Sequence, residues 1–162
     1  MILTALTLFH VVLSLVGIGA GFVVVYGLIA SKGFDGWTKL FLTTTIATSL
    51  TGFLFPIHQF TPGIAIGILS LVVLTAARLA RYRFDLAGGW RRTYAVTSVI
   101  ALYFNVFVLV AQLFRKVPAL KAIAPTGSEA TFQMVQLAVL LIFAYLGTRA
   151  AIKVHGEPSR TA

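Results

Sequence analysis

Residues 3–30, LTALTLFHVVLSLVGIGAGFVVVYGLIA, form an apolar stretch without a single Asp, Glu, Lys or Arg. A helix that crosses the roughly 30 Å hydrocarbon core of a bilayer needs about 20 apolar residues, so this stretch is long enough to span a membrane. A secretory signal peptide would carry a charged n-region and a small-residue cleavage site, and neither is found here. The stretch therefore predicts a retained membrane-spanning helix.

The rest of the chain repeats this pattern. Hydrophobic residues make up 59% of the 162-residue chain, more than a soluble domain of this length could bury. We therefore expect an all-α, polytopic membrane protein: a single transmembrane domain over 1–162 with five helices, each long enough to span a bilayer. Pro56, Pro62 and Gly63 predict a tight turn between the second helix and the third. The expected spans are 3–30, 38–57, 63–82, 93–114 and 131–153.

Basic residues are distributed unequally between the two sides of these spans. One side carries ten Lys and Arg residues and the other only three, and the positive-inside rule assigns the richer side to the cytoplasm. The rule predicts a bundle with its N-terminus outside and its C-terminus inside. The predicted cytoplasmic residues are Lys32, Lys39, Arg78, Arg81, Arg83, Arg91, Arg92, Arg149, Lys153 and Arg160, and the outer ones are Arg115, Lys116 and Lys121.

The net charge of +9 would suggest nucleic-acid binding in a soluble protein. Here the cations adjoin apolar stretches, where they anchor helix ends and meet anionic headgroups, so the expected partner is the lipid bilayer and no nucleic acid is expected. The chain contains no Cys, which excludes disulfides, thiolate nucleophiles and Cys-ligated metals.

Polar side chains concentrate in the outer half of the predicted bundle, with one amide near its midplane. This asymmetry predicts an outward-facing polar cavity among the first, second, fourth and fifth helices, which would bind or pass a small molecule. Amides can instead bond across helices and hydroxyls can bond back to their own helix, so a purely structural role is the alternative. The candidate ligand-binding residues are His10, His58, Asn105, Gln112, Gln133 and Gln136.

Carboxylate chemistry is not favoured. General acid–base catalysis with paired carboxylates needs two acids close together, whereas Asp35, Asp85 and Glu157 fall on the predicted cytoplasmic side and Glu129 is alone outside. We therefore expect a non-enzymatic protein. An accessory or scaffolding role beside a larger membrane complex is an alternative function, and the Gly-rich helix faces would also allow a homo-oligomer.

Two histidines give a second alternative, since neutral imidazoles bind haem iron or copper. His10 and His58 both lie toward the predicted outer side, and together they would form the metal site of a redox protein. Phe9-His10 followed by Gly17 resembles helices of copper-resistance-type and cytochrome b-type membrane proteins. Against this, His58 is expected about 10 Å shallower than His10 at 1.5 Å per helical residue.

Residues 55–62, FPIHQFTP, are the most distinctive stretch of the chain. With this turn, the whole chain resembles small bacterial inner-membrane proteins. The resemblance implies the multi-pass topology, a bacterial source and an inner-membrane location, and it brings no activity with it. The turn itself either binds a ligand through His58 or shapes the helical hairpin through its prolines.

Overall fold

The protein consists of long helices packed along one another, in a computed structural model that describes residues 1–56 and 60–155. No strand occurs in these residues. In chain order the elements are α1 (Ile2–Ala30), α2 (Asp35–Gly52), α3 (Pro62–Arg78), the π-helical turn η1 (Leu79–Arg83), α4 (Trp90–Lys116), α5 (Pro118–Ile123) and α6 (Ala130–His155).

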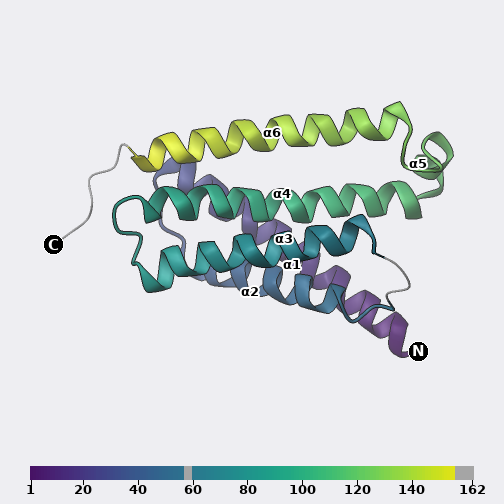
Figure 1. Cartoon of the computed structure of the whole chain (residues 1–162), viewed down its shortest axis with the longest axis horizontal. Coiled ribbons are helices and arrows are strands. Elements are labelled where there is room, and N and C mark those ends of the chain that lie inside the picture. The colour runs from purple at the N-terminus through teal and green to yellow at the C-terminus, as the bar shows by residue number, and fades with distance from the viewer. Residues whose placement is uncertain (57–59, 156–162) are drawn as a thin grey trace.

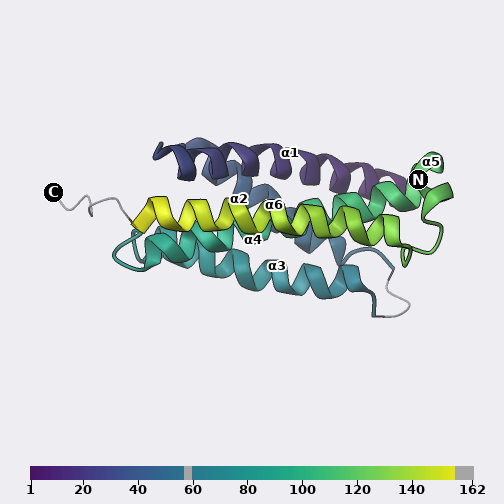
Figure 2. The same ribbon diagram turned by 90° about the horizontal axis from the view of Figure 1, so that it is seen from above.

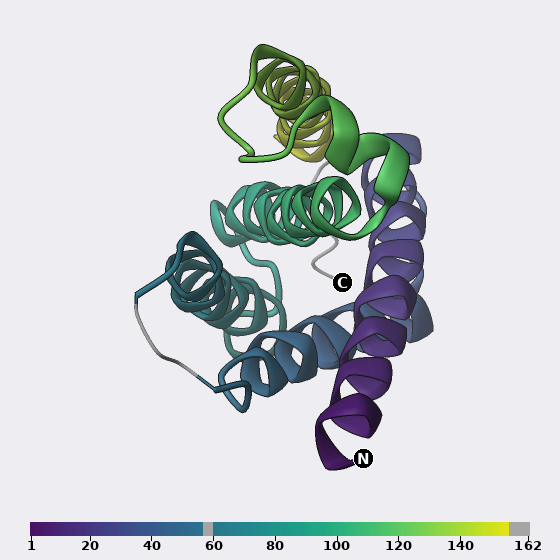
Figure 3. The same cartoon turned by 90° about the vertical axis from the view of Figure 1, so that its right-hand side faces the viewer.

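The five long helices alternate in direction along the longest axis of the molecule (Figure 1). Seen from the end, α1, α2, α3 and α4 form a ring, with α2 slanting from the α1 side to the α3 side (Figure 3). Helix α6 lies outside this ring against α4 and also contacts α1 (Figures 2 and 3). The ring places side chains from four helices around a common interior.

The two ends of the bundle differ in charge. At one end lie the N-terminus, α5, residues 53–56 and 60–61, and the connection 124–129, and we call it the N-terminal end (Figure 1). At the other lie the connections 31–34 and 84–89, and we call it the basic end. Among the described residues, the helix ends and connections at the basic end hold most of the Lys and Arg, whereas the N-terminal end holds Arg115, Lys116 and Lys121.

In the described part of the chain, four helical segments are long and apolar enough to cross a membrane, and they fit a multi-pass membrane protein. These are Ile2–Ala30, Pro62–Arg83, Trp90–Lys116 and Ala130–Val154. The helix expected over 38–57 instead occupies Asp35–Gly52 and is not one of the four. It begins at an acidic residue and holds many hydroxyls, which lower its hydropathy. It ends early because Gly52 and the residue before Pro56 both disfavour helix.

The core lies where α1 meets α2 and α4, and Gly21 makes this close approach possible. A Cβ at Gly21 would lie 2.6 Å from Leu102 Cδ1 and 2.9 Å from Phe41 Cε2. Both of those side chains are 0% exposed, so neither can move aside without disturbing its neighbours. On the same helix, a Cβ at Gly19 would have nothing within 4 Å.

We predict that Gly21→Ala lowers the melting temperature (Tm) of the purified protein, because overpacking a filled core costs about 1 to 3 kcal/mol. The matched control is Gly19→Ala, where the added methyl group meets open space and Ala favours helix over Gly by about 1 kcal/mol. Thermal unfolding of both variants in the same detergent measures the difference. Equal Tm values for the two variants would contradict the proposed packing.

Candidate ligand cavity

A cavity of about 770 Å³ lies inside the ring of α1, α2, α3 and α4, toward the N-terminal end. We call it the ring cavity. All four ring helices line it, whereas α6 contributes no residue. Its volume falls within the roughly 300 to 1,000 Å³ of typical small-molecule sites. Much of its wall is apolar, including Val11, Leu15, Ile64, Phe104 and Leu109.

Polar groups from every ring helix interrupt this apolar wall. No Asp or Glu lines the cavity among the described residues, and Lys116 is the one charged side chain that does so there. A few polar groups on an apolar wall are typical of sites that orient a small ligand. The polar residues from the helices are Thr7, His10 and Ser14 of α1, Thr48 and Ser49 of α2, Ser70 of α3, and Asn105, Gln112 and Lys116 of α4.

His10 joins α1 to the end of α2. Its Nδ1 lies 2.9 Å from the Thr51 hydroxyl oxygen, at hydrogen-bonding distance, and its ring meets the Phe55 ring edge-on at 5.4 Å between centroids. These two contacts give the imidazole a defined orientation in the cavity wall. Gly52 lies beside the imidazole, and a Cβ there would make ordinary van der Waals contact with His10 Cε1 at 3.6 Å.

Two buried polar atoms belong to residues that line the cavity and have no hydrogen-bond partner among the described residues: Thr48 Oγ1 and Asn105 Nδ2. Neighbouring hydroxyls behave differently, since Thr44 donates to the Leu40 carbonyl at 2.7 Å and Ser49 to the Thr45 carbonyl at 3.0 Å. An unpaired polar group away from water costs roughly 1 to 3 kcal/mol by mutational measures, and more in hydrocarbon. Such a cost is typical of groups kept for a ligand or for ordered water.

The polar groups continue from the cavity into the bundle around Gly17. A Cβ at Gly17 would lie 3.1 Å from both the Thr44 and Thr45 hydroxyl oxygens and 3.4 Å from Asn105 Nδ2. Groups from α2 and α4 therefore converge on the bare backbone of α1. Thr45 Oγ1, like Asn105 Nδ2, is buried without a described partner.

Some of the ligand-binding residues predicted from the sequence line the ring cavity, and others do not. His10, Asn105 and Gln112 line the ring cavity together. Gln133 and Gln136 lie on α6, outside the ring. His58 lies outside the described residues. The cavity expected among the first, second, fourth and fifth helices is thus enclosed with α3 in place of α6.

The two glutamines of α6 make local and interhelical bonds. Gln133 Nε2 donates to the Ser128 carbonyl at 3.0 Å, which ties the start of α6 to the loop before it. Gln136 is only 7% exposed, and its Nε2 donates to the Phe107 carbonyl of α4 at 3.0 Å. Such contacts are expected of amides that stabilise the bundle, which was the alternative to a ligand-binding role.

Sequence reasoning assigned no site role to Thr48, Ser49 or Ser70, which are buried and line the cavity. The signal available for the first two was the run of hydroxyls in 43–51, which equally suits packing. A single Ser in an apolar helix, as at Ser70, gives no signal of its own.

The haem or copper hypothesis rests on His10 and His58, and only His10 is described. Among the described residues, no group of three or more His, Cys, Asp or Glu side chains could hold a metal ion. The hypothesis therefore stays a prediction from the sequence.

Glu129 holds the loop before α6 and lies outside the helices. Its Oε1 accepts hydrogen bonds from the Thr126 backbone N–H at 2.9 Å and from the Thr126 hydroxyl at 2.8 Å. The backbone bond from Thr126 is the main cause that lowers the pKa of this carboxyl below its ordinary value. The carboxylate is thus engaged in a turn and does not line the ring cavity.

Comparisons of the chain with protein-family models, with curated proteins and with solved structures found no match.

Proposed function

We propose that this protein is a non-enzymatic membrane protein that binds or passes a small molecule in the ring cavity. The observation that carries the proposal is the pair of unpartnered buried groups, Thr48 Oγ1 and Asn105 Nδ2, on residues of an otherwise largely apolar cavity wall. Keeping such groups in a membrane bundle is costly, so a ligand or water that bonds to them supplies the reason for their presence. His10 and Gln112 add further polar contacts.

The wall also defines the kind of ligand. Its charge is limited to Lys116 among the described lining residues, and most of its side chains are apolar. A neutral or weakly anionic molecule with an apolar body and a few hydrogen-bonding groups fits such a wall. Coupling of passage to a carboxylate is disfavoured, because no Asp or Glu lies within the four apolar segments.

We propose further that α2 is a fifth span. Its 18 residues reach about 27 Å at 1.5 Å per residue, close to the hydrocarbon thickness of a bilayer. Its hydroxyls at Thr44, Thr45 and Thr48 are buried inside the bundle, whereas Leu40 and Leu50 are exposed. This inward-polar, outward-apolar arrangement suits a helix that faces lipid.

The same proposal assigns the basic end to the cytoplasm of a bacterial inner membrane, by the positive-inside rule. The N-terminus would then be outside, and the ring cavity would face outward, since Thr61 and Lys116 at the N-terminal end line it.

The absence of Cys allows a direct test of this orientation with single cysteines in intact bacterial cells. We expect a membrane-impermeant thiol reagent to label Ala119→Cys at the N-terminal end and to leave Gly33→Cys at the basic end unlabelled until the membrane is permeabilised. Both positions accept a side chain, since Ala119 is exposed and a Cβ at Gly33 has nothing within 4 Å. The reverse labelling pattern would overturn the orientation.

A matched pair of buried serines tests whether the ring cavity is accessible. Ser70 lines the cavity and is 5% exposed, whereas Ser98 is 0% exposed and does not line it. We expect a small thiol reagent to modify Ser70→Cys in the membrane and to spare Ser98→Cys. Mass spectrometry of the intact protein measures the modification. Protection of both cysteines would show that the cavity is closed to water and would count against a ligand site.

A pair of amides distinguishes binding from packing. We expect Asn105→Leu to leave the Tm unchanged or raise it, because it removes a buried donor without a described partner. Gln136→Leu should lower the Tm relative to Asn105→Leu, since it removes, along with an Oε1 that has no described partner, an interhelical bond worth about 0.6 to 2 kcal/mol. Thermal unfolding in one detergent compares the two variants. A loss of Tm in Asn105→Leu as large as that in Gln136→Leu would assign Asn105 a structural role.

A further inference from the structure

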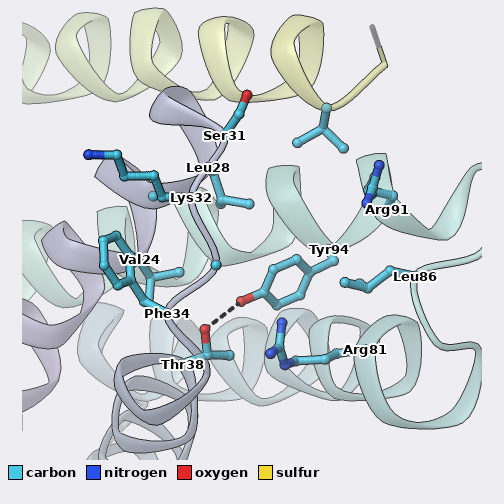
Figure 4. Close-up of a pocket in the computed structure, with 13 residues that line it drawn as sticks. Val24, Leu28, Ser31, Lys32, Phe34, Thr38, Arg81, Leu86, Arg91 and Tyr94 are labelled. Atoms are coloured by element: carbon cyan, nitrogen blue, oxygen red, sulfur yellow. Dashed lines mark hydrogen bonds between the residues drawn. The ribbon is translucent and has the colours of Figure 1, made fainter. Parts of the chain in front are cut away.

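A second cavity, of about 430 Å³, lies at the basic end of the bundle, and we call it the basic-end cavity (Figure 4). Residues at the end of α1 and at the starts of α2 and α4 line it, and the same three helices line the ring cavity. On α2 the nearest lining residues of the two cavities are Thr38 and Thr48, so about 15 Å of helix separates them at 1.5 Å per residue.

On each of these three helices, one face runs from one cavity to the other. Residues three or four positions apart on a helix share a face, and a row of four residues on each helix follows this spacing. The first and last residues of every row line a cavity, and the two between them line neither. The rows are Ser14, Gly17, Gly21 and Val24 of α1, Thr48, Thr45, Phe41 and Thr38 of α2, and Asn105, Leu102, Ser98 and Tyr94 of α4.

The three rows meet in the apolar contact at Gly21. The side chains of Phe41 and Leu102 are 0% exposed, and both occupy the space beside the bare backbone of Gly21, where a Cβ would lie 2.6 Å from Leu102 Cδ1. We call Gly21, Phe41 and Leu102 the apolar layer. Apolar constrictions of this kind exclude water and stop conduction in channels. The space between the two cavities is therefore closed in this structure.

Buried hydroxyls without a described partner lie on both sides of the apolar layer. Thr45 is one turn from Phe41 toward the ring cavity, and Ser98 is one turn from Leu102 toward the basic-end cavity. Thr45 is 1% exposed and Ser98 is 0% exposed, and neither hydroxyl oxygen has a hydrogen-bond partner among the described residues. Neither residue lines a cavity, so a ligand held in one cavity does not account for these two groups. Water or a solute that crosses the bundle would bond to both.

The polar groups of the three rows suit an uncharged solute. They are hydroxyls and one amide, and Tyr94 donates to the Thr38 hydroxyl oxygen at 3.3 Å where α4 faces α2 (Figure 4). None of the twelve row residues is charged, so an ion would lose its hydration at the apolar layer without compensation. Hydroxyls both donate and accept hydrogen bonds, and a small polyol offers groups of the same kind.

We propose that the two cavities are the ends of one route through the bundle for small polyols, and that the apolar layer is its closed gate. This inference rests on the function proposed for the ring cavity and specifies that function as passage. Because the Phe41 and Leu102 side chains are fully buried, opening requires α1 to move away from α2 and α4. The hydroxyls on both sides of the gate are then joined into one polar path.

Passage is measured with proteoliposomes that contain the full-length chain, by stopped-flow light scattering with glycerol, and with sucrose as a larger solute. Leu102→Ala should speed glycerol entry by about tenfold or more over the wild type, because it removes part of the apolar constriction. Sucrose should stay excluded. The matched control is Leu74→Ala on α3, which truncates another 0% exposed leucine that lines neither cavity. Phe41→Leu, a smaller change in the gate, repeats the test if Leu102→Ala does not fold.

Glycerol entry no faster in the gate variants than in Leu74→Ala, or entry of sucrose together with glycerol, would overturn the gate. Reactivity of Ser70→Cys separates this result from failure of the proposed function. If Ser70→Cys reacts and the gate variants do not speed glycerol entry, the ring cavity is a binding pocket without a route beyond it. If Ser70→Cys is protected, the ring cavity is closed to water, and the proposed function fails together with the route.

Discussion

The close approach of α1 to α2 and α4 is the contact on which the rest of the bundle depends. At Gly21 the backbone of α1 lies against the fully buried side chains of Phe41 and Leu102, with no room for a Cβ. One turn toward the N-terminus, Gly17 lies beside hydroxyls and an amide instead of hydrocarbon. The apolar contact closes the middle of the bundle, and the ring cavity lies beyond it toward the N-terminal end. Glycine at these positions thus supplies both tight packing and access to polar groups.

Polarity in this bundle runs opposite to that of a soluble protein. Thr44 and Ser49 are buried and donate to carbonyls of their own helix, while large apolar residues such as Phe22, Leu69 and Ile142 are exposed along the outside. In a bilayer the exposed apolar surface meets lipid, and the interior is the place where polar groups can find partners. Helix α2 shows this most clearly. It is less apolar than the other long helices, and its hydroxyls are buried against the neighbouring helices.

Hydropathy predicted the all-helical architecture, because an apolar run about 20 residues long has one stable conformation in lipid. The end of α2 could not be predicted from hydropathy, since residues 53–56 are as apolar as the helix before them and only Gly52 and Pro56 mark the boundary. Depth along a helix placed His10 and Gln112 toward one end of the bundle and Asn105 near its middle. Depth does not say which helices are neighbours. Gln136 and Asn105 were therefore both predicted as ligand-binding residues, although Gln136 bonds across to the Phe107 carbonyl. Ser70 was missed because the position of α3 in the ring depends on packing, which no single helix encodes.

We propose that water or a ligand in the ring cavity reaches the side chain of Asn105, which lines this cavity, and magnetisation transfer from water to its side-chain amide measures that access. Water-edited solid-state NMR of the protein in lipid bilayers can follow the side-chain amides of Asn105 and Gln136 in one sample. We predict that magnetisation from water reaches the amide of Asn105, a residue that lines the ring cavity, far faster than it reaches the Gln136 amide, which bonds to the Phe107 carbonyl. Transfer to Asn105 as slow as transfer to Gln136 would show that neither water nor ligand in the ring cavity reaches Asn105.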